Sequence, residues 1–306
     1  MKNTKIEGLL AAPFSALDQK GNLQLDVIDN YSKFLIKNGV KGVFVNGTSG
    51  EGYSLTVEER IATAEKWVDV SPINFKVIIQ IGHTSIKAAK KMAAHAQEIG
   101  AFGFGSMAPI FFKPSSVEEL FRYIAKEASA APNIPYYYYH IPQISGTNFP
   151  MVDLLKLLKD EIENFKGIKF SLPDLGDFKK CIEFNDGQYD ILYCQDQTLL
   201  SALVVGARGS IGSTYNYAAP LTLKIMEEYF KGNIEEASSL AYKSLKMVEV
   251  LENTGSYFAG AKELMRIAGI ELGTVRAPLN HIPKDKLALI VPELDKLGIV
   301  DYLSKK

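Results

Sequence analysis

The chain of 306 residues has few cysteines and histidines and almost no net charge. Its two cysteines, Cys181 and Cys194, are too few and too isolated for a disulfide framework or a metal site, and we expect both to be reduced and structural. The four histidines show no ligand spacing, so we expect no bound metal. The formal net charge of −1 argues against nucleic acid or an anionic membrane as a partner, because no basic excess is present.

The sequence also lacks a long hydrophobic run. No apolar stretch approaches the ~18 residues that a membrane-spanning helix needs. Residues 8–16 form an apolar segment near the N-terminus, as in a secretion signal, but Pro13 interrupts it and no cleavage site of small residues follows. We therefore expect a cytoplasmic protein. Because 47% of its residues are hydrophobic, the chain can bury the core of one large domain or of two small ones.

Short apolar runs alternate regularly with amphipathic segments along most of the chain. The runs predict eight strands, over residues 8–13, 42–46, 76–81, 103–108, 136–139, 167–170, 190–194 and 209–211. The segments between them predict helices over residues 25–38, 57–70, 86–99, 117–130, 151–159, 175–184 and 198–205. Such alternation indicates parallel βαβ units, and eight units favour a closed (β/α)8 barrel, or TIM barrel, over an open sheet.

The strand pattern ends after residue 211. Four further helices are predicted over residues 221–230, 234–251, 257–268 and 284–297. We predict a barrel domain over residues 1–230 that carries the active site, and a C-terminal helical extension over residues 231–306 that packs on the barrel. No linker or low-complexity segment separates the two parts, which favours one compact unit.

A lysine stands at the end of one predicted strand, in the apolar run Phe165-Lys166-Gly167-Ile168-Lys169-Phe170. Alternate residues of a strand face the same side, so Phe165, Gly167 and Lys169 share one face, and Gly167 leaves room beneath the lysine. Lys169 lies nearer the C-terminal end of the strand, where the active sites of barrels form. Poor solvation lowers the pKa of a lysine, and the resulting neutral amine can attack a ketone and form a Schiff base. A lysine that extends to solvent or pairs with a carboxylate is an equally good interpretation.

The loop Gly47-Thr48-Ser49-Gly50-Glu51 directly follows another predicted strand. Its two glycines allow a tight turn whose backbone N–H groups, together with the hydroxyls of Thr48 and Ser49, can bind an anion. A small carboxylate suits this loop better than a nucleotide does, because the lysine of a P-loop is missing. The alternative is an ordinary turn before a helix capped by Ser54 or Thr56, with Glu59 as the capping-box partner of Thr56.

Tyr139 closes a run of four tyrosines at the end of a third predicted strand. The alternation places Tyr137 and Tyr139 on one face and Tyr136, Tyr138 and His140 on the other. As the last tyrosine before the loop, Tyr139 is placed to reach the mouth of the barrel and to move protons beside a lysine amine. Most of these rings are interpreted as core aromatics.

These segments, together with Gly212-Ser213-Thr214-Tyr215-Asn216, occur in the order and spacing found in the N-acetylneuraminate lyase and dihydrodipicolinate synthase superfamily. The chain resembles this superfamily over essentially its whole length, including the helical tail. Within the superfamily, residues 108–114, 136–142 and 212–216 resemble the lyase branch.

The resemblance implies a cofactor-independent class I aldolase that cleaves N-acetylneuraminate reversibly to N-acetylmannosamine and pyruvate. It implies that Lys169 forms the Schiff base and that Tyr139, assisted by Thr48, relays protons. The positions that it assigns to substrate binding are Thr48, Ser49 and Gly50 at the carboxylate, Ser171 along the substrate chain, and Asp196, Gln197 and Ser213 at the hydroxylated tail. Members of the superfamily are commonly homotetramers, so the expected partners are small-molecule substrates and further copies of the chain.

The chain departs from the family pattern at several positions. Gln197 stands where lyases often have a glutamate, and it lacks the charge that strengthens a hydrogen bond. Phe111-Phe112 stands where bacterial lyases often have two tyrosines, so a hydroxyl from a neighbouring subunit is missing. The segment Tyr193-Cys194-Gln195 lacks a glycine that is common there. Residues 142–146 contain no arginine, whereas dihydrodipicolinate synthases usually have one in this loop, which argues against a dicarboxylate product.

Two other functions remain open from the sequence. One is the same aldolase chemistry on another 2-keto-3-deoxy sugar acid, which the departures at Gln197 and Phe111 support. The other is a sensor or binding module that kept a pyruvate pocket without turnover. Retention of Lys169, Tyr139 and Thr48 together argues against a binding module, since binding alone needs no nucleophile.

Overall fold

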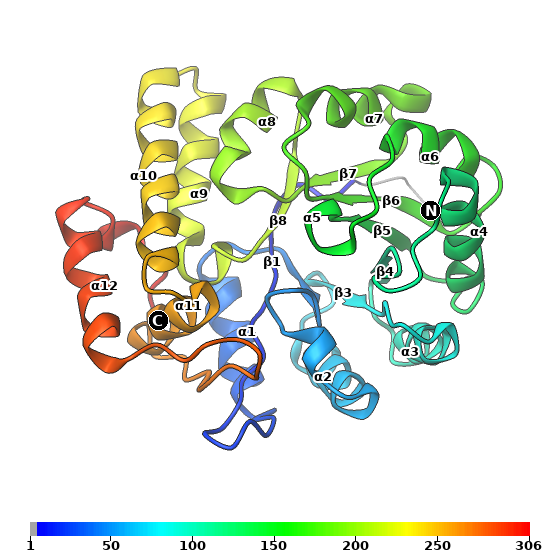
Figure 1. Cartoon of the computed structure of the whole chain (residues 1–306). Coiled ribbons are helices and arrows are strands. Elements are labelled where there is room, and N and C mark those ends of the chain that lie inside the picture. Colours follow the sequence, from blue (N-terminus) through cyan, green and yellow to red (C-terminus); the bar gives the residue numbers. More distant parts are fainter. Residues whose placement is uncertain (1–4) are drawn as a thin grey trace.

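Eight short strands pair in parallel in chain order (Figure 1). In the computed structural model, which describes residues 5–306, they are β1 (Gly8–Ala11), β2 (Gly42–Val45), β3 (Lys76–Gln80), β4 (Gly103–Met107), β5 (Tyr136–His140), β6 (Phe165–Phe170), β7 (Asp190–Tyr193) and β8 (Gly209–Gly212). β8 also pairs with β1, with Gly8 opposite Gly209 and Ala11 opposite Gly212, so the sheet closes. The predicted (β/α)8 barrel is confirmed. Residues 1–4 of the predicted barrel domain lie outside the described part of the chain.

Helices connect the strands and cover the outside of the barrel (Figure 1). They are α1 (Val27–Lys37), α2 (Val57–Val70), α3 (Ile86–Glu98), α4 (Val117–Ala128), α6 (Met151–Leu158), α7 (Leu175–Gly187) and α8 (Leu199–Val205), all close to their predicted limits. The capping box predicted for α2 is present: Thr56 Oγ1 accepts the Glu59 N–H at 3.2 Å, and the Glu59 carboxylate accepts the Thr56 N–H at 2.8 Å.

Three short elements lie in loops that follow strands. They are α5 (Pro142–Ser145) after β5 and two single 3-10 turns, η1 (Gly52–Ser54) after β2 and η2 (Asp196–Thr198) after β7. The sequence did not predict them, because one turn is too short to show a hydrophobic period.

Four longer helices follow β8: α9 (Tyr215–Phe230), α10 (Ile234–Glu252), α11 (Tyr257–Ile267) and α12 (Lys284–Lys296), with a last turn η3 (Val300–Tyr302). α9 begins well before its predicted start at residue 221, because it continues across a kink where Ala218 is non-helical and Pro220 follows. In Figure 1, α9 and α10 lie side by side along one side of the barrel. The domain boundary predicted at residues 230/231 falls between these two helices and stays a prediction.

The end of the extension returns to the barrel. The Ser304 N–H donates to the carbonyl oxygen of Tyr217 at 2.7 Å. Lys37 Nζ, at the end of α1, donates to the carbonyl oxygen of Lys306 at 2.6 Å. The extension thus continues from the barrel at its start and makes hydrogen bonds with the barrel side again at its end.

The apolar side chains form two layers, one inside the barrel and one between the strands and the helices. Tyr137 and Tyr139 lie in the inner layer, and Tyr136 and Tyr138 lie in the outer layer, which confirms the predicted alternation. His140 also lies on the outer side, where its ring contacts those of Tyr138 and Phe170.

Two expectations for β6 are wrong. The alternation places Phe165 on the inner face with Lys169, but Phe165 packs in the outer layer, because the register between β5 and β6 shifts between Tyr136 and Tyr137. Gly167 does not leave room for a substrate. A Cβ there would lie 1.9 Å from the carbonyl oxygen of Asp190, so the close approach of β7 is what requires glycine.

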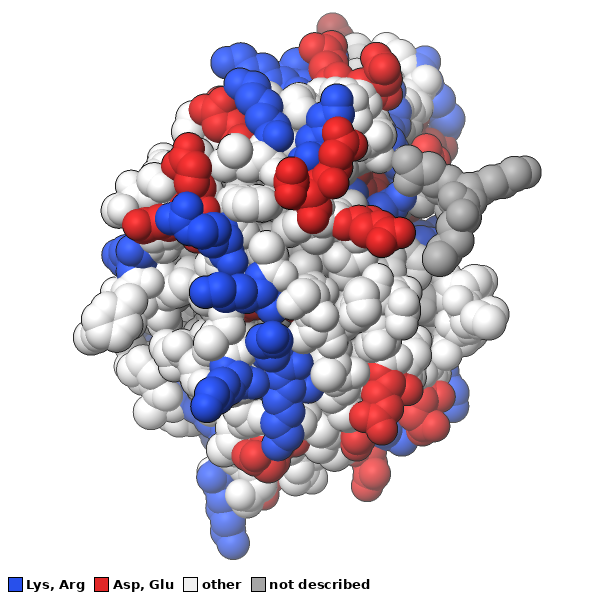
Figure 2. Space-filling view, turned by 90° about the vertical axis from the view of Figure 1, so that its right-hand side faces the viewer, with Lys and Arg blue, Asp and Glu red and all other residues white. Residues whose placement is uncertain are grey.

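The surface carries charges of both signs. On the face shown in Figure 2, lysine and arginine side chains lie among aspartate and glutamate side chains, with uncharged surface between them. Over residues 5–306, no helix is both long and apolar enough to cross a bilayer. In the same residues, no group of three or more histidine, cysteine, aspartate or glutamate side chains is placed to hold a metal ion.

Candidate active site

A cavity of about 220 Å³ lies at the C-terminal ends of the strands, where barrel enzymes carry their active sites. Eight of the residues predicted from the sequence line it: Thr48, Ser49, Tyr139, Lys169, Ser171, Asp196, Gln197 and Ser213. Gly50, also predicted, is not among its lining residues. The Gly50 carbonyl oxygen instead accepts the Ser15 hydroxyl at 2.6 Å, and a Cβ at Gly50 would lie 3.0 Å from the carbonyl oxygen of Pro13.

Lys169 extends from β6 into this cavity and is only 4% exposed. Its Nζ lies 3.6 Å from the centroid of the Tyr139 ring and 5.2 Å from that of the Phe44 ring. Tyr139 lies opposite Lys169 in the pairing of β5 with β6, which fixes this contact. The negative faces of the rings stabilise an ammonium group. The burial excludes a lysine that extends to solvent.

The Lys169 pKa is subject to opposing influences. Burial is the largest of them and lowers the pKa, as expected from the sequence. Cys194, Tyr139 and Asp196 favour the ammonium form, and together they hold the Lys169 pKa above its ordinary value. The expectation of a lowered Lys169 pKa is therefore wrong. The amine must lose a proton before it can attack a ketone.

A hydroxyl pair lies beside the lysine. The Thr48 hydroxyl, in the loop after β2, is 3.4 Å from the Tyr139 hydroxyl, and either can donate a hydrogen bond to the other. The Tyr139 ring is held edge-on against Phe44, with 5.4 Å between the ring centroids. Tyr139 therefore contacts Lys169 through its ring and Thr48 through its hydroxyl, which places two hydroxyls close to the lysine.

Asp196, in the turn after β7, and Ser171, directly after β6, also line the cavity. Asp196 Oδ2 accepts the N–H of Thr214 at 2.9 Å and its hydroxyl at 2.7 Å. Burial is the main influence on the Asp196 pKa and raises it, although Thr214 and Lys169 favour the carboxylate. A Cβ at Gly212 would lie 2.1 Å from Asp196 Oδ1, so glycine is needed beneath the carboxylate. The Ser171 hydroxyl donates to the carbonyl oxygen of Cys194 at 3.2 Å.

The C-terminal extension also lines the cavity, which the sequence did not reveal. Its contribution consists of Val248 and Glu252 of α10 and Tyr257 and Phe258 of α11. The Tyr257 hydroxyl lies 2.7 Å from Ser213 Oγ. Glu252 is exposed, and its charge, after the larger effect of burial, contributes to the raised pKa of Tyr257. These residues lie on helices whose apolar period indicates packing only, so no sequence signal marked them.

Cys194 is a further lining residue that the sequence did not assign to the site. Both cysteines are free and buried, and Cys194 also lines the cavity. Its thiol donates to the carbonyl oxygen of Leu192 at 3.3 Å.

The arrangement combines a buried primary amine, hydroxyls within reach of it and a polar wall. The amine is a nucleophile for a ketone once it is deprotonated. The hydroxyls of Tyr139 and Thr48 can transfer protons, and those of Thr48, Ser49 and Ser213 can bind an oxygen-rich substrate.

Comparison with known proteins agrees with this chemistry. The profile of the Dihydrodipicolinate synthetase family matches residues 5–295. N-acetylneuraminate lyase of Rattus norvegicus is 36% identical over 97% of this chain and 94% of that protein. The lyase of Homo sapiens is 37% identical over 99% of this chain and 96% of that protein.

Solved structures give the same result. Proteus mirabilis N-acetylneuraminate lyase matches with a TM-score of 0.93 and 35% identity over 97% of this chain and 100% of that chain. The sialic acid aldolase from Aliivibrio salmonicida matches with a TM-score of 0.94 and 35% identity over 97% of this chain and 98% of that chain. The resemblance seen in the motifs is confirmed, and the chain belongs to the dihydrodipicolinate synthetase family.

Proposed function

We propose that the chain is a class I aldolase, a carbon–carbon lyase that cleaves N-acetylneuraminate reversibly to N-acetylmannosamine and pyruvate. The observation that carries the proposal is the buried Lys169 Nζ, 3.6 Å from the Tyr139 ring centroid in a cavity that also contains the Thr48 hydroxyl. The lyases at 36% and 37% identity over nearly the whole chain support the substrate. A lysine Schiff base supplies the electron sink itself, so we propose that no cofactor is used.

The proposed reaction begins when the Lys169 ammonium gives up a proton and the neutral amine attacks the C2 ketone. The same proton returns to the oxygen of the adduct, which leaves as water, and a protonated Schiff base remains. This cation accepts the electron pair of the C3–C4 bond as that bond breaks. The C4 hydroxyl loses its proton and becomes the aldehyde of N-acetylmannosamine, while the enamine of pyruvate stays on the lysine. Protonation of the enamine and hydrolysis then release pyruvate and restore the amine.

Tyr139 and Thr48 move the protons in this proposal. The raised Lys169 pKa means that the first step must remove a proton from the ammonium. Tyr139 contacts Nζ through its ring, and its hydroxyl lies 3.4 Å from that of Thr48, so both hydroxyls lie close to the lysine. We propose that a small movement of the substrate-bound site brings them to this proton and to the one from the C4 hydroxyl.

The remaining lining residues are proposed to select the substrate. Thr48 and Ser49 bind the carboxylate next to the reacting ketone, and Ser171 contacts the chain beyond it. Asp196, Gln197 and Ser213 bind the hydroxylated tail. Glu252 on α10 adds a carboxylate at the same cavity, where the longer end of a nine-carbon acid reaches the extension.

A second candidate function is the same reaction on a shorter 2-keto-3-deoxy sugar acid. Gln197 favours it, because an amide binds a hydroxyl less strongly than a carboxylate does. The presence of Glu252 in the same cavity favours the longer acid. A binding module without turnover is disfavoured by the contact of a nucleophilic lysine with a tyrosine of the hydroxyl pair.

We propose that the protein is a cytoplasmic homotetramer. Phe111 and Phe112, in the loop after β4, are 76% and 84% exposed and contact each other edge to face. Two adjacent aromatic side chains in water are typical of a surface that another subunit covers.

Pyruvate release, coupled to lactate dehydrogenase, is expected to be at least about tenfold more efficient from N-acetylneuraminate than from 2-keto-3-deoxygluconate, since only the longer acid can use the extension side of the cavity. A preference for the shorter acid would support the second candidate. Tight binding in calorimetry without product would support a binding module.

Lys169→Ala is expected to lose at least ~1,000-fold in kcat in the same assay, because no other amine replaces the nucleophile. Near-normal turnover by Lys169→Ala would contradict the mechanism.

The rate of Schiff-base formation with pyruvate is expected to rise with pH. A raised Lys169 pKa leaves a small neutral fraction at pH 6, and this fraction grows about tenfold for each pH unit below the pKa. Borohydride trapping at low pyruvate concentration, followed by mass spectrometry from pH 6 to pH 8, measures the rate. A trapping rate that stays constant across this range would show that burial lowers the Lys169 pKa by more than the neighbouring groups raise it.

Glu252→Gln is expected to lower kcat/KM for N-acetylneuraminate by about three- to tenfold, because a neutral amide binds the tail hydroxyls less strongly. The same variant is expected to trap pyruvate like the unmodified chain, since pyruvate has no tail. Equal losses for N-acetylneuraminate and the six-carbon acid would show that Glu252 does not recognise the tail.

Light scattering is expected to give the mass of four chains of 33.8 kDa each. The double variant Phe111→Ser/Phe112→Ser is expected to give a smaller assembly, because it removes the apolar surface that another subunit would cover. Ile73→Ser, at a fully exposed single apolar side chain, is the matched control and should keep the tetramer. A monomer before any substitution would contradict the proposed assembly.

A further inference from the structure

We infer that Glu51, held by Lys262 and Arg276 of the C-terminal extension, is a positioning residue that keeps the loop of residues 47–51 in the shape that binds the substrate carboxylate. The inference rests on the proposed function, because it concerns the carboxylate of a 2-keto acid. None of these three residues lines the cavity, so they act through the loop and do not touch the substrate.

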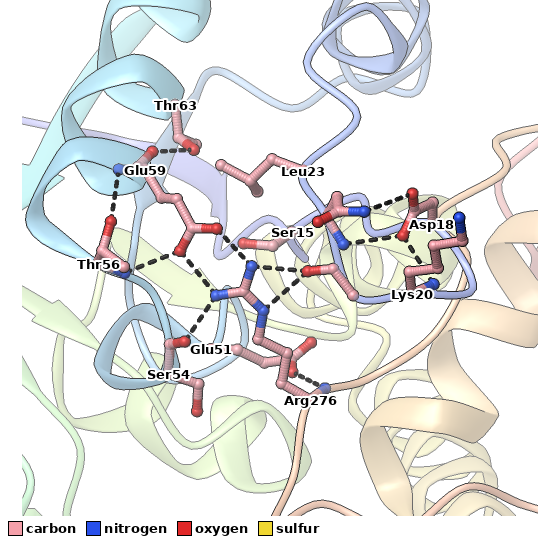
Figure 3. A network of polar contacts seen from close by, with 12 residues as sticks. Ser15, Asp18, Lys20, Leu23, Glu51, Ser54, Thr56, Glu59, Thr63 and Arg276 are labelled. Carbon is pink, nitrogen blue, oxygen red and sulfur yellow. Dashed lines mark hydrogen bonds and ion pairs between the residues drawn. The ribbon is translucent and has the colours of Figure 1, made fainter.

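The extension engages both oxygens of the Glu51 carboxylate, and Figure 3 shows the contact made by Arg276. Lys262 Nζ of α11 donates to Oε1 at 2.8 Å, and the Arg276 N–H donates to Oε2 at 2.7 Å. Lys262 also donates to the carbonyl oxygen of Thr274. The side chains of Glu51 and Lys262 are 0% and 2% exposed, so water does not screen their attraction and neither charge has a substitute partner in solvent.

Arg276 fastens the same segment of the extension to the start of α2 (Figure 3). Its guanidinium donates to both carboxylate oxygens of Glu59, at 2.7 and 2.5 Å, and to the carbonyl oxygen of Ser54 at 2.8 Å. It also donates to the carbonyl oxygen of Gly21 at 2.6 Å. The Arg276 guanidinium thus joins the extension to the barrel through contacts that do not involve Glu51.

The loop needs such support because Glu51 has a left-handed backbone, with φ of +52°. A residue with a side chain adopts this conformation at a cost, and it persists where the surroundings fix it. The turn is closed by the Glu51 N–H to the Thr48 carbonyl oxygen at 3.0 Å and by the Gly52 N–H to the Gly47 carbonyl oxygen at 3.1 Å. The fixed Glu51 carboxylate thus holds the turn from which Thr48 and Ser49 face the cavity.

Loss of the contacts that hold Glu51 should weaken binding of the substrate carboxylate, but should change the rate of reaction at Lys169 much less. Lys169 and Tyr139 lie on β6 and β5, and the strand pairing holds them independently of the loop. The expected signature is therefore a higher concentration of keto acid at half-saturation with a nearly unchanged maximal rate.

The test uses pyruvate alone, which is trapped on Lys169 by borohydride whatever sugar acid the enzyme prefers. Glu51→Gln keeps the size of the side chain but replaces one of its two acceptor oxygens with a donor. We expect it to raise the half-saturating pyruvate concentration by about tenfold, with the maximal trapping rate within about twofold of that of the unmodified chain. Lys262→Met should act in the same direction.

Glu59→Gln is the matched control. It weakens the ion pair of Arg276 at the same contact between barrel and extension, but leaves both hydrogen bonds to Glu51. Its half-saturating pyruvate concentration is expected to stay within about twofold of the original. Melting temperatures of all variants, measured in parallel, separate a local change in the loop from general loss of stability.

Unchanged half-saturation in Glu51→Gln would overturn the inference, and so would an equal rise in Glu59→Gln, since general loosening of the extension would then suffice. If Lys262→Met does not fold because Glu51 is left buried without a partner, the double variant Glu51→Gln/Lys262→Met, which leaves no buried charge, gives the same readout. Failure of the unmodified chain to be trapped by pyruvate would overturn the proposed function and the inference with it. Normal trapping with unaffected variants would overturn the inference alone.

Discussion

The whole site depends on closure of the barrel by the parallel pairing of β8 with β1. Closure arranges the eight strand ends in a ring, so that loops far apart in the sequence face one cavity. It also brings neighbouring backbones very close. A Cβ at Gly42 or Gly167 would lie 2.3 or 1.9 Å from a carbonyl oxygen of the next strand, and one at Gly209 would lie 2.4 Å from that of Ile6, just before β1. Glycine at these positions is thus a requirement of the barrel and not of the chemistry.

The sequence predicted well whatever depends on neighbours along the chain. The alternation of the tyrosines was read correctly because strand geometry fixes it within five residues. The capping box of Thr56 and Glu59 was found because its partners are three residues apart. Eight of the predicted site residues line the cavity, since the strands that carry the motifs end at the same rim.

The features that the sequence did not reveal arise from contacts between residues that are distant in the chain. Burial of Lys169 was foreseen, but the groups that favour its ammonium come from other strands and loops, so the direction of its pKa was not. Phe165 was placed on the wrong face because a register shift against β5 leaves no mark in a single strand. The ion pair of Glu51 with Lys262 joins residues on opposite sides of the predicted domain boundary, and local patterns carry no information about it.

A single helix of the extension serves two parts of the site. Tyr257, in the first turn of α11, lines the cavity beside Ser213, and Lys262, on the same helix, contacts Glu51 behind the loop after β2. A rigid helix between these two points fixes the distance between them. The extension, whose helices carry no reactive group of the proposed mechanism, thus sets the spacing between the region proposed to bind the carboxylate and the region proposed to bind the tail.

The return of the chain end to α9 affects the order in which the site is made. Ser304 donates its N–H to the carbonyl oxygen of Tyr217, and the hydroxyl of Tyr217 lies 2.9 Å from that of Tyr257 in the cavity wall. A ribosome that has completed the eight strands has already made Lys169, Tyr139 and Thr48. The part of the cavity wall that α10 and α11 supply follows later, and the contact of Ser304 with Tyr217 can form only when almost the whole extension has been made. The cavity wall is therefore completed from the barrel outward, with its support at Tyr217 added last.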